Sequence, residues 1–368
     1  MRILILGGTG AIGKYLIDIL ATQRNNVYVT SRKQYSCQTE YIHYIQGNAH
    51  DMDFLTDILK TSWDAIIDFM VYNNSEFRQR VNILLNSTTQ YVFLSTSRVY
   101  AESKMPITEE SPRLLDVNND KIFLSTNEYP LEKARQENLL KACEKKNWTI
   151  VRPYITYSNQ RLQLGVYEKE NWLYRALQGK TIVFSKDIAS KNTTLTCGYD
   201  VASTIAKLID NKASFGETLH IATSDYLPWG DILNIYLDVI EEKTKKRPNV
   251  YLTDTSADMG IVLNKYPIIY DRLYNRLFNS TKANYICDCK INYILIENGL
   301  RQCLNEFLDS DGQFGPIAWG LEAYMDRLTS ERTCLREIPT WKSRIKYFIL
   351  RYTPYFPLKR IYSRFYDR

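Results

Sequence analysis

Short apolar runs alternate with amphipathic segments through the first half of the chain. The apolar runs predict buried strands at 3–6, 27–30, 41–45, 65–70, 91–95 and 149–153. Between them, apolar positions recur at helical spacing over 14–20, 53–59, 76–85 and 132–145. Strands that alternate with helices predict an α/β fold, with a doubly wound parallel sheet covered on both faces.

Three glycines directly follow the first apolar run. Gly7, Gly10 and Gly13 have the spacing GxxGxxG and separate the first predicted strand from the first predicted helix. A strand, glycine turn and helix in this order cradle the pyrophosphate of a dinucleotide. Gly7 would let the chain turn tightly, Gly10 would let the backbone approach the phosphates, and Gly13 would let helix and strand pack closely. The N–H groups at the start of the helix would face the anion.

After residue 157 the alternation loosens, and short helices and loops surround two further strands predicted at 181–184 and 218–221. We therefore expect a Rossmann-type NAD(P)-binding domain over 1–156. A smaller α/β substrate lobe over 157–330 is expected to be interleaved with it. The remaining residues, 331–368, form a basic, aromatic extension.

The composition changes this picture little. The chain has 368 residues, of which 45% are hydrophobic, enough for a large core. The net charge of +6 suits a small anionic substrate but is ordinary for a soluble protein. No apolar run approaches the length of a membrane span, and the chain opens on the first predicted strand, so a cytoplasmic protein is expected. The seven cysteines are scattered, so we expect free thiols and no metal site.

Tyr129 and Lys133 are four residues apart, which places both side chains on one face of a helix. A lysine ammonium close to a tyrosine hydroxyl favours the phenolate, and the pair can then act as a general acid or base. A YxxxK pair also occurs by chance, as two solvated side chains on a helix face. The run from Leu94 to Tyr100 gives the pair a context, because its hydroxyl groups would lie at the carboxyl edge of the sheet.

With the glycine turn, the hydroxyl-bearing strand end and YxxxK in this order, residues 1–310 resemble the NAD-dependent epimerase/dehydratase family. This is a family of extended short-chain dehydrogenases/reductases that modify nucleotide-linked sugars. The resemblance implies catalytic roles for Thr96, Tyr129 and Lys133. It also implies that Tyr129 and Lys133 contact the cofactor together with a wider set of residues: Gly7, Thr9, Gly10, Ala11, Ile12, Gly13, Ser31, Arg32, Asn48, Phe69, Pro153, Tyr154 and Ile155.

Two motifs indicate which reaction and which cofactor of the family to expect in this chain. Dehydratases of the family place Asp-Glu after the catalytic threonine, whereas this chain has Ser97-Arg98, which disfavours elimination of water. The predicted second strand ends in Thr-Ser-Arg-Lys at 30–33, with no acidic residue to bind the ribose of NAD. The Arg32 guanidinium suits a phosphate, so NADP is expected in preference to NAD. A basic surface loop is the alternative interpretation.

The extension leaves two alternatives open. From Trp341 onward the chain has eight Lys/Arg residues and one acidic residue, Asp367, among many large apolar side chains. This composition suits an interfacial segment on an anionic membrane. It equally suits a segment packed on the body of the enzyme or on a second subunit. We favour packing, because Pro354 and Pro357 interrupt a long helix.

The sequence therefore predicts an enzyme that reduces a nucleotide-linked ketosugar with hydride from NADPH, with Tyr129 as the acid. A redox-neutral epimerase with bound NAD(P)⁺ is the nearest alternative, and a reductase of small carbonyl compounds is another. A non-catalytic NAD(P)- or RNA-binding member of the superfamily is disfavoured by the presence of the catalytic residues, so no nucleic acid partner is expected. The family also implies a homodimer through the helices predicted at 76–85 and 132–145.

Overall fold

The computed structural model describes residues 1–35, 40–257, 263–310 and 312–353. Pro354, Pro357 and the last four basic residues lie outside this part of the chain. The chain forms two compact units, each assembled from separated segments. Unit 1 comprises Met1–Ser158, Thr194–Tyr226 and Arg276–Ile296, and unit 2 comprises Asn159–Thr193, Leu227–Asn275 and the residues from Glu297 onward.

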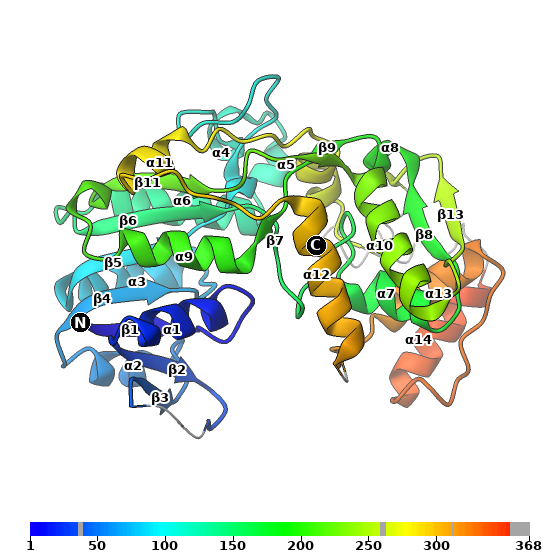
Figure 1. The fold of residues 1–368 in the computed structure, drawn as a ribbon, viewed down its shortest axis with the longest axis horizontal. Coiled ribbons are helices and arrows are strands. Elements are labelled where there is room, and N and C mark those ends of the chain that lie inside the picture. The colour runs from blue at the N-terminus through cyan, green and yellow to red at the C-terminus, as the bar shows by residue number, and fades with distance from the viewer. Residues whose placement is uncertain (36–39, 258–262, 311, 354–368) are drawn as a thin grey trace. The chain divides into compact units, whose positions relative to one another are not determined.

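A seven-stranded parallel sheet is the centre of unit 1 (Figure 1). Its strands, in the spatial order β11-β6-β5-β4-β1-β2-β3, are β11 (Glu217–Ile221), β6 (Trp148–Pro153), β5 (Thr88–Leu94), β4 (Trp63–Asp68), β1 (Arg2–Leu6), β2 (Asn26–Ser31) and β3 (Ile42–Gln46). β1 pairs with β2 on one side and β4 on the other, so Ile5 lies between Val29 and Ile67. The strand order reverses beside β1, and ligands of such sheets bind at the carboxyl edge where this happens.

Helices cover both faces of this sheet. One face packs against α1 (Gly13–Thr22), α9 (Gly198–Leu208) and α11 (Thr281–Ile286), through residues such as Ile5, Leu16 and Ile205. The other face packs against α2 (Met52–Ile58), α3 (Asn74–Asn86) and α6 (Tyr129–Ala142), through residues such as Leu55, Leu84 and Leu140. The expected doubly wound α/β architecture is confirmed.

Shorter elements complete unit 1. They are η1 (Ser97–Val99), α4 (Leu114–Val117), α5 (Lys121–Leu124), η2 (Lys212–Ser214) and a parallel pair of two-residue strands, β7 (Thr156–Tyr157) and β10 (Thr196–Cys197). Strand β11 forms where the apolar pattern predicts it, but it joins the main sheet rather than a separate lobe, with Leu219 opposite Val151. Its partner lies about 70 residues earlier in the chain, and local periodicity carries no information about such a distant pairing.

Unit 2 is mostly helical. Its helices are α7 (Lys169–Leu177), α8 (Lys186–Ala189), α10 (Trp229–Thr244), η4 (Ile268–Arg272), α12 (Ile296–Asp309), α13 (Trp319–Leu328) and α14 (Trp341–Tyr352). Its strands form two small pairs: β8 (Ile182–Ser185) runs parallel to β13 (Val250–Thr253), and β9 (Asn192–Thr193) runs antiparallel to β12 (Leu227–Pro228). Trp172 stacks on Tyr236 in its interior, with ring centroids 4.4 Å apart.

Candidate active site

The glycine loop joins β1 to α1, and its three motif glycines have different surroundings. Gly7 has a φ of +72°, which L side chains rarely adopt, and its N–H donates to Thr30 Oγ1 at 3.2 Å. A Cβ atom on Gly13 would lie 2.2 Å from the carbonyl oxygen of Gly8, so helix and loop touch there. A Cβ atom on Gly10 would have no protein atom within 4 Å. The loop therefore packs tightly at Gly7 and Gly13 and leaves open space at Gly10.

The rest of the loop leaves room for a ligand. Thr9 and Gly10 are exposed, and Ala11 and Ile12 are partly exposed. The start of α9 lies against the loop, because a Cβ atom on Gly198 would be 2.6 Å from the carbonyl oxygen of Ala11. The requirement for glycine at position 198 could not be predicted from the sequence, because nothing in the local sequence indicates that residues 11 and 198 are in contact.

The carboxyl ends of β2 and β3 lie side by side, with Ser31 opposite Gln46. Ser31 is partly exposed and its Oγ accepts a hydrogen bond from Lys33 N–H at 3.1 Å, while the side chain of Arg32 is exposed. Asn48, just beyond β3, is also exposed, and its Oδ1 accepts from His50 N–H at 3.2 Å. These positions offer hydroxyl, guanidinium and amide groups at one edge of the sheet.

Lys133 is buried on α6, against the ends of β4 and β5. Its Nζ donates to the carbonyl oxygen of Met70 at 3.2 Å and lies 4.4 Å from the centroid of the Phe93 ring. Burial lowers the pKa of Lys133 to about 8, although the nearby carboxylate of Asp68 opposes this change. Phe69, which precedes Met70, is held by a hydrogen bond from its N–H to the Leu6 carbonyl at 2.9 Å.

Asp68 is itself fully buried at the end of β4. Its carboxylate accepts hydrogen bonds from the Tyr91 hydroxyl at 2.8 Å and from Met70 N–H at 2.9 Å. Burial raises the pKa of this carboxyl group, while these hydrogen bonds and the ammonium of Lys133 act in the opposite direction. The hydrogen bonds of Asp68 therefore fix the loop that follows β4, against which Lys133 packs.

Thr96 and Tyr129 both lie close to Arg98. Thr96 is the N-cap of η1, and its Oγ1 accepts a hydrogen bond from Arg98 N–H at 3.2 Å. The guanidinium carbon of Arg98 lies 6.0 Å from the centroid of the Tyr129 ring. Tyr129 opens α6, with Pro130 in its first turn. Sequence reasoning used Arg98 only as an argument against a dehydratase and missed its place beside Tyr129.

A buried ion pair joins α6 to β6 below these residues. Glu137, one turn after Lys133, accepts from Arg152 Nε at 2.8 Å and Nη2 at 2.6 Å. Glu137 also accepts from Ser95 Oγ at 2.6 Å and from Arg113 Nη1 at 3.1 Å. The pair thereby binds the end of β5 to the helix that carries Tyr129 and Lys133. Sequence reasoning did not single out Glu137, although its helical spacing from Lys133 was a usable signal.

The segment after β6 turns sharply at Ile155, which has a φ of +20°. The carbonyl oxygen of Ile155 accepts from Thr196 N–H at 3.1 Å, and the buried ring of Tyr154 packs against Phe278 at 5.1 Å between centroids. Pro153 remains partly exposed. All the residues predicted to bind the cofactor or to act in catalysis lie in unit 1.

Comparisons with known proteins show which family the chain belongs to. Residues 3–222 match the model of the NAD dependent epimerase/dehydratase family. The chain is 26% identical over 334 residues to UDP-N-acetyl-alpha-D-glucosaminuronate decarboxylase of Bacillus cytotoxicus, an alignment covering 83% of this chain and 97% of that protein. It is 23% identical to 2'-dehydrokanamycin reductase of Streptomyces kanamyceticus, over 63% of this chain and 64% of that protein.

Among solved structures, the fold is similar to that of UDP-glucuronic acid 4-epimerase from Bacillus cereus, determined with UDP-glucuronic acid and NAD. The TM-score is 0.63 at 15% identity, and the match covers 83% of this chain and all of the other. The family match spans more than half of the chain and includes the glycine loop, Thr96, Tyr129 and Lys133. The chain therefore belongs to the NAD dependent epimerase/dehydratase family.

Proposed function

We propose that this protein is an oxidoreductase of a nucleotide-linked sugar, and that it reduces a ketosugar with hydride from NADPH. The observation that carries the proposal is the buried ammonium of Lys133, on the helix of Tyr129 and at the carboxyl edge of the sheet. Burying an ammonium costs stability unless it is paired, and titratable groups perturbed in this way cluster at functional sites. A protein that only binds a dinucleotide has no chemical need for Thr96, Tyr129 and Lys133 together.

The chain's own residues fit a dinucleotide. Gly10 leaves open space where the pyrophosphate is expected, and Lys133 and Ile155 lie near the ends of β4 and β6. When bound, NADPH would supply the hydride that reduces the sugar carbonyl. Tyr129 would donate a proton to the developing alkoxide, and the ammonium of Lys133 would stabilise the phenolate that remains. The hydroxyl of Thr96 would orient the same sugar oxygen.

Arg98 supports hydride transfer without elimination. Its guanidinium occupies the position after Thr96 and Ser97 where a dehydratase of the family carries an acid, and a guanidinium stays protonated at working pH and so cannot act as a general acid or base. A cation beside Tyr129 also favours the phenolate. Neither effect distinguishes reduction from epimerisation.

The preference for NADP rests on the end of β2. Ser31, Arg32 and Lys33 supply a hydroxyl and two cations, and no acidic side chain stands there to bind a free ribose hydroxyl. An arginine fork binds a phosphate with two parallel hydrogen bonds. NADP is commonly kept reduced and is exchanged at each turnover, which favours net reduction.

Epimerisation is the second candidate, because the similar Bacillus cereus protein is a 4-epimerase whose structure holds NAD. The two reactions differ in stoichiometry. The protein is incubated with UDP- and dTDP-linked ketosugars and NADPH, and absorbance of the reduced nicotinamide is followed together with product formation. One NADPH consumed per product supports reduction. Interconversion of epimers of UDP- or dTDP-linked hexoses by the protein, with no net change in the cofactor, would replace reduction by epimerisation.

We also propose that the protein is a homodimer that pairs α3 and α6 of each copy into a four-helix interface. The two helices pack against each other in unit 1 and end at a groove formed by residues such as Asn82, Leu139 and Cys143. Light scattering at micromolar concentration tests the proposal: a dimer supports it, and a monomer alone contradicts it.

A further inference from the structure

Helix α14 presents three different faces. Tyr347 and Leu350 are buried in a small apolar cluster with Ala323 and Ile338 of unit 2. The opposite face consists of large apolar side chains that are 43% to 66% exposed: Trp341, Ile345, Phe348, Ile349 and Tyr352. At 3.6 residues per turn these five side chains fall within an arc of roughly 100°.

Cations border the exposed apolar arc on both sides. By the same helical spacing, Lys342 and Lys346 lie along one edge, and Arg344 and Arg351 lie along the other. Residues 341–353 contain no aspartate or glutamate. Among the described residues, none of the four cations forms an ion pair, and the two arginines donate instead to the carbonyl oxygens of Ile338 and Glu331, at 2.8 and 3.0 Å. Within the described residues, no carboxylate therefore neutralises their charge.

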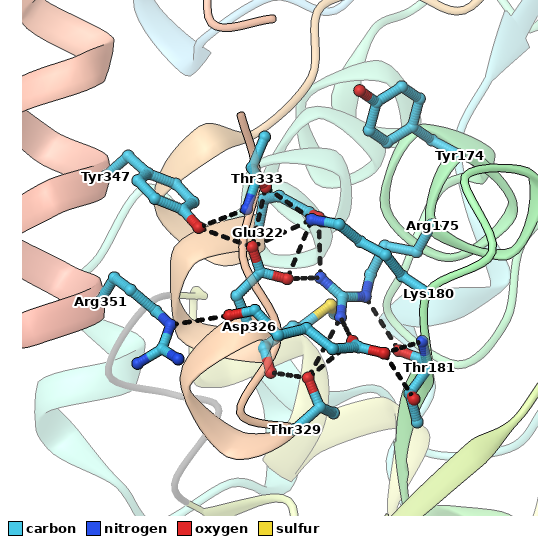
Figure 2. A network of polar contacts seen from close by, with 12 residues as sticks. Tyr174, Arg175, Lys180, Thr181, Glu322, Asp326, Thr329, Thr333, Tyr347 and Arg351 are labelled. Carbon is cyan, nitrogen blue, oxygen red and sulfur yellow. Dashed lines mark hydrogen bonds and ion pairs between the residues drawn. The ribbon is translucent and has the colours of Figure 1, made fainter. Parts of the chain in front are cut away.

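A buried polar network fixes the helix in this orientation (Figure 2). The Tyr347 hydroxyl donates to Asp326 Oδ2 at 2.7 Å and accepts from Thr333 N–H at 2.8 Å. Asp326 is in turn paired with Arg175 of α7 at 2.8 Å and with Lys180 at 3.0 Å. Because the buried face is anchored through these contacts, α14 cannot turn its outer apolar side chains inward without breaking the network.

We propose that α14 docks unit 2 flat onto the surface of a membrane rich in anionic phospholipids. The apolar arc would enter the boundary between headgroups and acyl chains, and the two rows of cations would contact the phosphates. The long Lys and Arg side chains can reach outward while their methylene groups stay near the apolar region. None of the described helices has the length and apolar character needed to cross a bilayer, so this contact would lie in the plane of the membrane.

Charge favours a membrane over a second copy of the chain. A twofold dimer through this face would bring the same four cations of each copy together, and like charges across an interface disfavour association. The sequence left two alternatives for the extension, packing on the protein and contact with a membrane. Helix α14 is compatible with both, because it packs on its own unit through Tyr347 and exposes its opposite face. It also ends at Tyr352, before Pro354.

The test is flotation of the full-length protein with vesicles of phosphatidylcholine alone, or of phosphatidylcholine mixed with phosphatidylglycerol. We expect binding to the mixed vesicles only, weakened when salt is raised from about 0.1 M to about 0.5 M. The double variant Ile345→Ser/Phe348→Ser should lose at least about tenfold in partitioning. Lys342→Glu/Lys346→Glu should lose at least about 25-fold, since each surface cation contributes about fivefold and the introduced carboxylates are repelled by the anionic lipid.

Tyr285→Ser/Leu295→Ser is the matched control, because both of its apolar residues are exposed in unit 1, at 81% and 59%. It should bind vesicles as the unmodified protein does. All variants should keep the far-ultraviolet circular dichroism of the unmodified chain. Equal binding by the α14 variants and the control would overturn the proposal. An absence of vesicle binding by the unmodified protein would also overturn it. If the unmodified protein were then a dimer and Ile345→Ser/Phe348→Ser a monomer, the exposed face of α14 would be assigned to contact with a second copy.

Discussion

The ammonium nitrogen of Lys133 lies 3.2 Å from the backbone carbonyl oxygen of Met70, in the loop that follows β4. This hydrogen bond joins the helix of Tyr129 to the carboxyl edge of the sheet, beside the strand that leads to Thr96. The surrounding burial lowers the pKa of Lys133 to about 8. The charge of this lysine is therefore sensitive to pH in a range where the enzyme can be assayed.

We predict that activity falls as pH rises through about 8, by about tenfold per pH unit, because Lys133 then loses the charge that stabilises the phenolate of Tyr129. Lys133→Arg, which keeps its charge, should be slower but should lack this descending limb. Profiles of kcat between pH 6 and 10 measure both. Superimposable profiles for the two proteins would mean that Lys133 does not titrate in the reaction.

The same pKa has a consequence for stability. Between pH 8 and 10.5 the unfolded chain binds the lysine proton and the folded chain does not, so the unfolding free energy rises with pH. Denaturant unfolding of the unmodified chain and of Lys133→Met should show that the difference between them changes in this window. A difference that is constant with pH would contradict the lowered pKa.

Gly10 and Gly13 form a matched pair of positions. A methyl group on Gly13 would lie 2.2 Å from the Gly8 carbonyl oxygen, so Gly13→Ala should cost roughly 1–3 kcal/mol or more of stability. A methyl group on Gly10 meets no protein atom within 4 Å, so Gly10→Ala should fold normally. It should nevertheless weaken dinucleotide binding at least about tenfold, since the methyl group occupies ligand space. Thermal unfolding measures the loss of stability, and calorimetry measures dinucleotide binding. Tight dinucleotide binding by Gly10→Ala would show that the pyrophosphate does not bind at this loop.

These two glycines also show how far sequence reasoning reaches. Their spacing after an apolar run predicts the strand, the turn and the helix, because each depends on neighbours in the chain. The same logic finds Tyr129 and Lys133 on one helix face. It cannot find that Gly198 touches Ala11, or that β11 pairs with β6, because those contacts join distant segments. Arg98 was visible in the sequence, but its closeness to Tyr129 depends on how η1 and α6 pack.

The Glu137–Arg152 pair should matter more for stability than an exposed ion pair. Glu137→Gln would leave a buried guanidinium without its charge partner, and we expect a loss of roughly 3–5 kcal/mol. Asp57→Asn, in the exposed pair with Lys60, should cause no measurable change. Denaturant unfolding at pH 7 gives both values. Equal effects of the two substitutions would contradict a structural role for the buried pair.

The pair should also shape acid stability. Burial opposes ionisation of Glu137, but hydrogen bonds from Arg152 outweigh it and lower the pKa below the usual 4.5. The stabilisation is therefore present above pH 4.5 and is lost as pH falls through the lowered pKa. The difference in unfolding free energy between the unmodified protein and Glu137→Gln should narrow as pH falls from 6 to 3. A gap that stays unchanged over this whole range would show that the carboxylate charge is not the cause.

Arg32 tests the choice of cofactor. We expect NADP(H) to bind more tightly than NAD(H), and Arg32→Asp to reverse the order by roughly tenfold to a hundredfold, because it exchanges a phosphate ligand for a repelling charge. Lys290→Asp makes the same charge change at another exposed site of unit 1 and should leave the order unchanged. Calorimetry with both cofactors decides the question, and tighter binding of NAD to the unmodified protein would refute the argument.

The role of Tyr129 is tested most directly by NADPH oxidation with nucleotide-linked ketosugars, compared between the unmodified protein, Tyr129→Phe and Tyr251→Phe. Tyr251 is an exposed tyrosine of unit 2 and serves as the control. We predict that Tyr129→Phe lowers kcat by roughly 10²–10⁴-fold while NADPH affinity stays within a few-fold, because only the positioned acid is lost. Tyr251→Phe should retain full activity. A near-normal kcat for Tyr129→Phe would contradict the assignment of Tyr129 as the acid of this enzyme.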